Sequence, residues 1–266
     1  ARYQPAVLWN DIGYPAAANV KRLFADYYNA VPDGVVNDRF VQLRIPNSRF
    51  VQALLRLAVR LAMKSGGGAP GGAHFDFRTP EYTSYKKIVR KKWEATRGLG
   101  YSFGYNQQER PEDMLSVEKL VHLFVDIVSK NGNLLLNVGP AAEGTIPPAQ
   151  QERLLGLGAW LAVNGDAVFD TYPWLLAEGH TTDGTAIRFT QKGEALYAIL
   201  LGTPRSPQIA VESLVAAPAT RIHLLGHDEP VPWTQDAGRL TITLPERLPP
   251  SPAHALRIVP QPQWVK

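Results

Sequence analysis

Up to about residue 175, the chain alternates short apolar runs rich in β-forming residues with segments of helical periodicity. The strand pattern occurs in four runs, at 6–10, 34–38, 92–96 and 133–138, each followed by turn residues and then by a helix-like segment. Such alternation is typical of βα units arranged around a parallel sheet. We therefore predict an α/β domain for this part of the chain.

Two helices can be predicted with their ends. Apolar residues recur at helical spacing from Val117 to Val128, behind Ser116, a residue type that caps helix N-termini, and we expect Gly132 to end this helix. A second helix is expected from Pro147, a residue type favoured in the first turn, to a stop near Gly165.

From about residue 180 the pattern changes to short alternating segments, at 185–190, 195–201, 220–225, 240–244 and 255–259. These segments indicate antiparallel strands, and residues 191–194 are expected to join the first two as a hairpin. The density of proline and glycine around the others is typical of a small β-sandwich. With a junction at 171–174, the predicted domains are 1–178 and 179–266.

The segment 41–74 has a different character. Its residues 50–63 are apolar and basic, which predicts an amphipathic helix, and the glycine-rich residues 65–72 predict a flexible loop. A phosphate-binding glycine loop is the alternative. Because no strand precedes the glycines and no Gly-Lys-Ser/Thr follows them, the sequence favours a linker.

Composition argues against several classes of protein. The chain has no cysteine, so neither a disulfide nor a thiolate metal site can form, and nothing fixes the compartment. No apolar stretch approaches the roughly 20 residues of a membrane helix. The net charge of +4 comes from scattered basic residues without interleaved base-stacking aromatic residues. We expect neither a membrane nor nucleic acid as a partner.

The first apolar run, Val7-Leu8-Trp9-Asn10-Asp11, ends in a carboxylate, which places Asp11 at the rim where barrel enzymes form their active sites. Further runs follow in order: Gly34-Val35-Val36-Asn37-Asp38-Arg39, Thr79-Pro80-Glu81-Tyr82, Lys92-Trp93-Glu94, Ser102-Phe103-Gly104-Tyr105-Asn106 and Asn133-Leu134-Leu135-Leu136-Asn137-Val138-Gly139-Pro140. Together these runs resemble the α-L-fucosidases of glycoside hydrolase family 29.

The resemblance implies a (β/α)8-type barrel followed by a small antiparallel β-sandwich. A full barrel takes about 250 residues, and in the family the motif similar to Trp9-Asn10-Asp11 follows the fourth strand. We therefore expect an incomplete barrel, its C-terminal part only, with 41–74 as an insertion. Because unpaired strand edges tend to aggregate, we expect a homo-oligomer or a companion chain to complete the barrel.

The resemblance also assigns catalytic roles. Retaining glycosidases use one carboxylate as nucleophile and one carboxylic acid as acid/base. Asp11 corresponds to the nucleophile of the family, although an aspartate after a strand is also common in turns. Glu81 lies in the segment that carries the acid/base in close relatives. Glu94 is the competitor for that role, and we interpret it as a residue that orients a neighbouring group.

Four residues are predicted to contact substrate: Trp9, Arg39, Glu94 and Tyr105. Arg39 corresponds to an arginine that binds sugar hydroxyls in the family, a task suited to the donors of a guanidinium, although an isolated arginine would be read as an ion-pair partner. The indole of Trp9 offers an apolar face to fucose, with core packing as the alternative. Asn106 and Asn137 are weaker candidates that could instead satisfy loop backbone groups.

The function implied by the resemblance is a retaining α-L-fucosidase that removes terminal α-L-fucose from fucosylated glycans through a covalent fucosyl-enzyme, without metal or cofactor. Two alternatives stay open. The histidines and aromatic residues that the family uses from its first strands have no counterpart here, so the chain could be a catalytically incomplete remnant that binds carbohydrate or another protein. Residues 180–266 could also act alone as a glycan-binding module.

Overall fold

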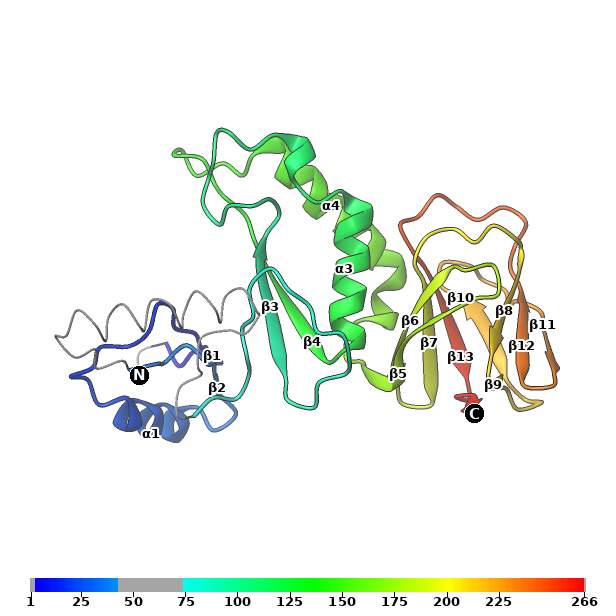
Figure 1. Ribbon diagram of the computed structural model, residues 1–266, viewed down its shortest axis with the longest axis horizontal. Helices are drawn as coiled ribbons and strands as arrows, with labels where there is room; N and C mark the ends of the chain where they lie inside the picture. Colours follow the sequence, from blue (N-terminus) through cyan, green and yellow to red (C-terminus); the bar gives the residue numbers. More distant parts are fainter. Residues whose placement is uncertain (1–2, 43–73, 266) are drawn as a thin grey trace, which may run out of the picture. The chain divides into compact units, whose positions relative to one another are not determined.

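A computed structural model describes residues 3–42 and 74–265 of the chain. The helix predicted at 50–63 and the loop predicted at 65–72 lie outside the described residues. The chain divides into two compact units (Figure 1): Ala1–Ser84 with Val89–Thr96, and Tyr85–Ile88 with Arg97–Lys266. This division differs from the domain boundary predicted at 178, because two helices that precede residue 178 pack on the C-terminal sheet.

The first unit begins with a βαβ element. β1 (Val7–Leu8) pairs in parallel with β2 (Val35–Val36), and α1 (Val20–Ala30) connects them. The hydroxyl of Tyr27 on α1 donates to the carbonyl of Ala6, 2.9 Å away, which fastens the helix to the start of β1. Gly34 is required beside this contact, because a Cβ at that position would lie 2.5 Å from the Tyr27 hydroxyl oxygen.

Parallel pairing continues beyond β2 through isolated bridges: Asn37 with Phe77, Arg78 with Trp93, and Glu81 with Thr96. The last two bridges involve β3 (Trp93–Gly98), which runs from the first unit into the second. The strands predicted at 6–10, 34–38 and 92–96 are thus present as β1, β2 and β3. The bridging segment at Phe77–Arg78 was not predicted, because it is too short to show a strand pattern.

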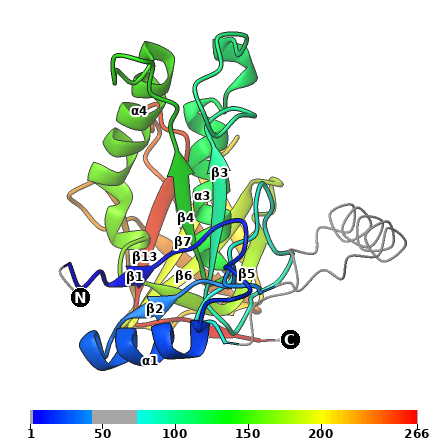
Figure 2. The ribbon, with the colours of Figure 1, turned by 90° about the vertical axis from the view of Figure 1, so that its left-hand side faces the viewer.

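The second unit contains the two predicted helices (Figure 2). α3 (Val117–Ser129) begins after Ser116, whose hydroxyl accepts a hydrogen bond from the backbone N–H of Lys119, as expected for a cap. The prediction for its C-terminus was wrong. Asn131 adopts the left-handed conformation, with φ 74°, and Gly132 is already the first residue of β4 (Gly132–Asn137). Asparagine tolerates this conformation because its short polar side chain can form hydrogen bonds with nearby groups.

α4 (Pro148–Asn164) occupies the predicted range, with Pro147 as its N-cap and Gly165 as its C-cap. The remaining elements are two short 3-10 helices and a series of antiparallel strands: η1 (Pro111–Asp113), η2 (Gly165–Ala167), β5 (Tyr172–His180), β6 (Ala186–Lys192), β7 (Ala195–Leu200), β8 (Gln208–Glu212), β9 (Leu214–Val215), β10 (Arg221–Leu224), β11 (Trp233–Asp236), β12 (Arg239–Thr243), β13 (His254–Val259) and β14 (Gln263–Trp264).

These strands form a five-stranded sheet in the order β10-β13-β7-β6-β5, a three-stranded sheet β11-β12-β8 and a small pair β14-β9. The five predicted segments correspond to β6, β7, β10, β12 and β13, and the predicted hairpin joins β6 to β7, with Lys192 paired to Ala195. The predicted junction at 171–174 falls at the start of β5, which is an edge strand of the larger sheet.

Both faces of the five-stranded sheet are covered. Along β7 every residue is buried, and successive side chains point to opposite faces. Leu196, Ala198 and Leu200 pack in the core that includes the three-stranded sheet, whereas Ala195, Tyr197 and Ile199 pack against α3 and α4. The C-terminal part is therefore a sandwich whose larger sheet also has a helical layer.

An ion-pair cluster fastens α3 to this sheet. Asp126 on α3 accepts hydrogen bonds of 2.7 Å from Lys130 Nζ and from Arg188 Nε on β6. Glu178 on β5 lies 3.3 Å from Arg188 Nη2. The Lys130 side chain is only 6% exposed. A charge removed from water to this extent needs such partners to remain in place.

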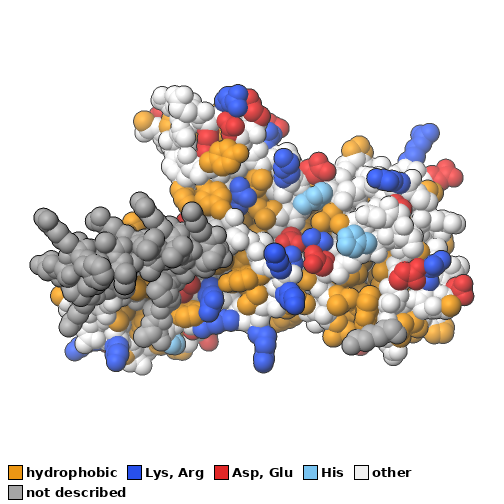
Figure 3. All heavy atoms as spheres, viewed as in Figure 1, with side chains coloured by type: hydrophobic (Ala, Val, Ile, Leu, Met, Phe, Trp, Pro, Cys, Tyr) orange, Lys and Arg blue, Asp and Glu red, His pale blue; other side chains and the backbone are white. Residues whose placement is uncertain are grey.

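On the face of the molecule in Figure 3, positive and negative side chains are intermixed over much of the second unit. No helix in the described ranges has the length and apolar character that crossing a membrane requires.

The contact between α3 and α4 depends on Gly156. A Cβ at this position would lie 2.5 Å from Cγ2 of Val117, a β-branched side chain with little rotamer freedom. We expect Gly156→Ala to lower the free energy of unfolding by about 1–3 kcal/mol through overpacking, measured by urea denaturation. Gly104→Ala is the control, because its Cβ would meet nothing within 4 Å. Equal urea midpoints for the two variants would contradict the prediction.

Candidate active site

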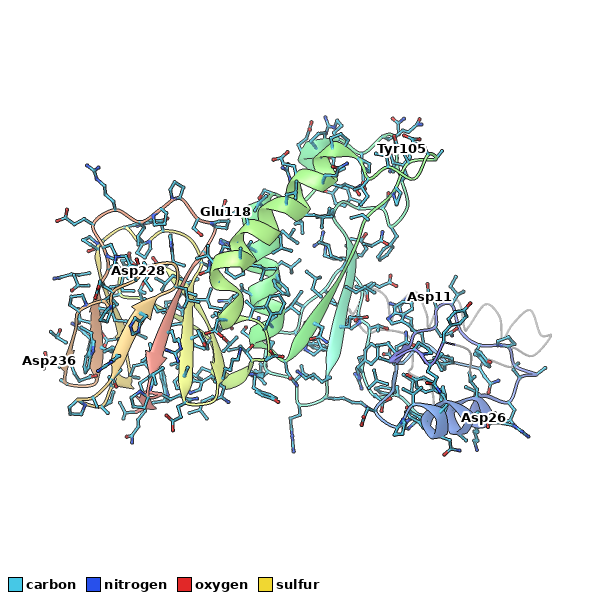
Figure 4. The ribbon with its side chains drawn as sticks, turned by 180° about the vertical axis from the view of Figure 1, so that it is seen from behind. Asp11, Asp26, Tyr105, Glu118, Asp228 and Asp236 are labelled. Atoms are coloured by element: carbon cyan, nitrogen blue, oxygen red, sulfur yellow. The ribbon has the colours of Figure 1, made fainter. Side chains whose placement is uncertain are left out.

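The predicted catalytic residues lie beyond three neighbouring parallel segments of the first unit. Asp11 follows β1, Arg39 follows β2, and Glu81 follows the bridging segment at Phe77–Arg78. Parallel strands direct their carboxyl ends to one edge of a sheet, so side chains that follow them can converge there. Figure 4 shows Asp11 beyond β1.

Arg39 joins the two acidic residues. Its Nη1 donates a hydrogen bond of 2.7 Å to Asp11 Oδ1 and one of 2.6 Å to Glu81 Oε1. Because both oxygens bind one nitrogen, they lie at most about 5.3 Å apart, the sum of these two lengths. The Arg39 side chain is 16% exposed, whereas those of Asp11 and Glu81 are 53% and 45% exposed. The Arg39 guanidinium is thus largely buried, whereas the two carboxylates that it binds are accessible to solvent.

The opposite edge of the guanidinium is held by Thr79. Arg39 Nε donates to Thr79 Oγ1 at 2.8 Å, and Arg39 Nη2 donates to the Thr79 carbonyl at 2.9 Å. Asp38 completes the arrangement, because its Oδ1 accepts from the hydroxyl of Thr79 at 2.7 Å and from its backbone N–H at 3.1 Å.

Trp9 and Glu94 form a second layer behind Arg39. The guanidinium carbon of Arg39 lies 4.9 Å from the centroid of the Trp9 ring, within the range of a cation–π interaction. The indole N–H of Trp9 donates to Glu94 Oε1 at 2.9 Å. Glu94 therefore binds the indole that lies against Arg39.

Two asparagines hold the backbone that carries these side chains. Asn37 is fully buried and exchanges two hydrogen bonds with Asn10: the Asn10 N–H donates to Asn37 Oδ1, and Asn37 Nδ2 donates to the Asn10 carbonyl. Asn10 Nδ2 donates in turn to the carbonyl of Arg39 at 3.1 Å. The positions of Asp11 and Arg39 are therefore coupled through their backbones.

The chain turns sharply directly after Asp11. Ile12 has a φ of 60° and Gly13 a φ of 89°, both in the left-handed region. A β-branched residue is strained in this conformation. The turn directs the Ile12 N–H onto Asp11 Oδ1, 2.8 Å away, and leaves the Ile12 side chain in solvent.

These contacts set the charge of the site. Partial burial alone would raise the pKa of Asp11, but the hydrogen bonds from Arg39 and Ile12 and the positive charge of Arg39 outweigh it and hold the pKa below its usual value. Burial acts to lower the pKa of Arg39, but its contacts with Asp11 and Glu81 raise the pKa above its usual range. Asp11 is therefore an anion at neutral pH.

The other predicted residues belong to the second unit. Tyr105 is exposed on the loop that follows β3 (Figure 4). Asn106 Nδ2 donates to Ser102 Oγ at 3.1 Å, and Asn137 Nδ2 donates to the carbonyl of Phe103. Both amides thus bind groups of this loop. Across the described parts of both units, no group of three or more histidine, aspartate or glutamate residues is placed to hold a metal ion.

The structure adds residues to which the sequence assigned no role. Asn10, Asn37, Asp38 and Thr79 all belong to the quoted motifs, yet only their contacts show what each one holds. The sequence did hold a signal that could have identified them as residues of the site. Each is a polar residue at or just beyond the end of a parallel segment, where polar side chains meet.

Comparison with known proteins gives consistent matches. Residues 1–166 match the sequence profile described as alpha-L-fucosidase, and residues 181–259 match that of the alpha-L-fucosidase C-terminal domain. The tissue alpha-L-fucosidase of Homo sapiens is 37% identical over 162 residues, 60% of this chain and 34% of the relative. That of Rattus norvegicus is 35% identical over 257 residues, 94% of this chain and 50% of the relative.

Solved structures of alpha-L-fucosidases are also similar to this chain. An alpha-L-fucosidase with 42% identity superposes with a TM-score of 0.79, over 97% of this chain and 52% of its own. The alpha-fucosidase of Thermotoga maritima in complex with a mechanism-based inhibitor is also 42% identical, with a TM-score of 0.78 over 97% and 53% of the two chains. The 266 residues thus span between about a third and half of the length of these relatives.

Replacing Arg39 tests the electrostatics of the site. Arg39→Met removes the cation, so we expect the pKa of Asp11 to rise, because the hydrogen bond and the positive charge that lower this pKa are lost. Carbon-13 NMR titration of the aspartate carboxyl groups measures this, with Asp11→Asn to assign the signal. Arg22→Met removes an exposed arginine 3.6 Å from Asp26 and is the matched control. An Asp11 signal that titrates alike in both variants would contradict the prediction.

Proposed function

The chain belongs to the α-L-fucosidase family, and on that premise we propose that Asp11 and Glu81 are the catalytic pair of a retaining α-L-fucosidase. The observation that carries the proposal is the Arg39 bridge, which limits the two carboxylate oxygens to a separation of at most about 5.3 Å. Retaining glycosidases place their carboxyl groups about 5–5.5 Å apart, whereas inverting enzymes need roughly 6.5–9.5 Å to admit a water molecule.

In the proposed reaction, a carboxylate oxygen of Asp11 attacks the anomeric carbon of fucose. The bond to the leaving oxygen breaks as that oxygen takes the proton of Glu81, and a fucosyl ester on Asp11 results. Water then attacks the same carbon and gives its proton to Glu81, and Asp11 leaves as a carboxylate. The lowered pKa of Asp11 supports its role, because only the anion is a nucleophile.

The proposed substrate is a terminal α-L-fucose of an oligosaccharide or glycoconjugate. One relative at 41% identity, the alpha-fucosidase of Thermotoga maritima, has been solved in complex with fucose. Trp9 and Arg39 are proposed to contact the sugar or its leaving group, and Glu94 to act through Trp9. Two carboxyl groups and water suffice for the reaction, so we propose neither a metal nor a cofactor.

We also propose that the 266 residues hold an incomplete barrel, the C-terminal part, whose open surface is covered by a second copy of the chain. The support is on α4, whose outer face is apolar: Leu155 and Val163 are 72% and 51% exposed, beside exposed Gly158, Ala159 and Ala162. No charged residue occurs between residues 154 and 164. A helix that is apolar on all sides is normally buried.

A second copy suits this face because an uncharged surface meets its own copy without repulsion, and small residues let two helices approach closely. The alternative function is a catalytically incomplete remnant that binds carbohydrate or a partner. The similarity to alpha-L-fucosidases supports the catalytic proposal over this alternative. The two readings differ in whether the pure chain turns over substrate.

Hydrolysis of 4-nitrophenyl-α-L-fucoside by the 266-residue chain tests the catalytic proposal. We expect turnover in which α-L-fucose forms first, seen by proton NMR, and a loss of at least about 10⁴-fold in kcat for Asp11→Ala. Glu81→Ala should cost about 10²–10⁴-fold. Asp26→Ala, an exposed aspartate on α1, is the control. Folded protein without turnover would favour the remnant, and initial formation of β-L-fucose would exclude retention.

Light scattering tests the covered α4 face. We expect a mass above the 29.3 kDa of one chain, and a shift to the monomer in Leu155→Glu, because the introduced charge would be buried in the contact. Leu175→Glu is the matched control, since Leu175 is 71% exposed on β5 rather than on α4. A wild-type monomer would rule out self-association, and the same mass for both variants would exclude α4 as the contact.

A further inference from the structure

Arg39 can hold Asp11 and Glu81 only while its guanidinium keeps one orientation. The side chain has several rotatable bonds, and Nη1 must point to both carboxylates at once. The orientation of the guanidinium is therefore set by the residue that accepts hydrogen bonds from its other edge. That edge, Nε with Nη2, is bound at two points by one residue, Thr79, through its hydroxyl and its carbonyl oxygen.

The hydroxyl of Thr79 can act as an acceptor only if its own proton is directed elsewhere. A threonine hydroxyl has one proton and two lone pairs. Asp38 Oδ1 lies 2.7 Å from this oxygen and takes the proton, which leaves a lone pair for Arg39 Nε. The backbone N–H of Thr79 donates to the same Asp38 oxygen at 3.1 Å. Two hydrogen bonds therefore hold Thr79 against the Asp38 carboxylate.

From this geometry we infer that Thr79 and Asp38 are positioning residues, which orient Arg39 so that it keeps the Asp11 and Glu81 carboxylates together. The inference rests on the proposed function and names residues that act on the same site through Arg39. Neither Thr79 nor Asp38 is assigned a contact with the reacting atoms.

Two features make the grip rigid. Thr79 is 6% exposed, so water does not compete freely for its hydroxyl. The carbonyl of its neighbour Pro80 accepts a hydrogen bond of 2.9 Å from the backbone N–H of Thr96 on β3. This bond fixes the segment between Thr79 and Glu81. Residues 79–81 therefore supply both the acceptors that orient Arg39 and one of the two carboxylates that Arg39 binds.

Loss of the grip has a specific consequence. If Nε and Nη2 lose the hydroxyl acceptor, the guanidinium can rotate and Nη1 can leave the two carboxylates. Arg39 contacts Asp11 directly, and Glu81 contacts the same nitrogen of Arg39. Asp11 would then lose the hydrogen bond and the attraction of Arg39, which raises its pKa. A residue with a purely structural role would not produce this shift.

The experiment uses carbon-13 NMR titration of Asp11 in the full chain, which does not require turnover. Thr79→Val keeps the shape and removes the hydroxyl, and we expect the pKa of Asp11 to shift upward in the direction seen for Arg39→Met. Thr79→Ser restores the hydroxyl and should restore the wild-type titration. Thr83→Val, the same change at an exposed threonine, is the matched control. Asp38→Ala should shift Asp11 as Thr79→Val does, and provides the test if Thr79→Val does not fold.

A double-mutant cycle tests the order of action. If Asp38 acts through the Thr79 hydroxyl, Asp38→Ala should add little to the shift in a Thr79→Val background. Where the chain hydrolyses substrate, Thr79→Val should lower kcat/KM by roughly 10- to 100-fold. An unchanged Asp11 titration in both Thr79→Val and Asp38→Ala would overturn the inference. A shifted titration in a chain without turnover would support the positioning role and contradict only the proposed catalysis.

Discussion

The candidate site depends on the parallel register of four short segments in the first unit. β1 pairs with β2, and bridges at Asn37, Arg78 and Glu81 continue the pairing to β3. Parallel pairing brings residues that are 28 to 70 positions apart in sequence to one edge. Because each strand is only a few residues long, the register is reinforced by side chains. The reciprocal hydrogen bonds of Asn10 and Asn37 do this at the strand ends.

Arg39 gives this edge the geometry of the proposed catalytic site. Its Nη1 sets the distance between two carboxylates that would otherwise repel each other, and the same contact keeps Asp11 ionised. Thr79 and Trp9 contact the rest of the guanidinium, and Asp38 binds Thr79. A planar group with five donors in fixed directions suits this task better than an ammonium would. The geometry of the acids thus follows from the packing of one cation.

The second unit is stabilised in a different way, through a sheet with no open face. Alternate side chains of β7 enter two separate cores, one with the three-stranded sheet and one with α3 and α4. The Asp126 cluster adds a charged connection between α3 and β6. The helices of the α/β pattern and the C-terminal strands therefore share a core, which explains why the unit boundary lies before α3. Hydrophobic periodicity identifies each element but not which face another element covers.

Periodicity and motifs are local properties of the chain, so they were enough to predict β1 to β4, β6, β7, β10, β12, β13, α3 and α4, the antiparallel C-terminal part, the family, and Asp11, Glu81, Arg39 and Trp9 as candidates. They did not reveal the bridging segment at Phe77–Arg78 or strands β5, β8, β9, β11 and β14. The sequence did not determine that Arg39 bridges both acids, that Thr79 and Asp38 hold Arg39, or that Glu94 binds Trp9. The sequence placed the end of α3 at Gly132, one residue past the left-handed Asn131. These contacts became visible in the folded chain, because each depends on side chains from different segments meeting at a few ångströms, and spacing along the chain does not encode such distances.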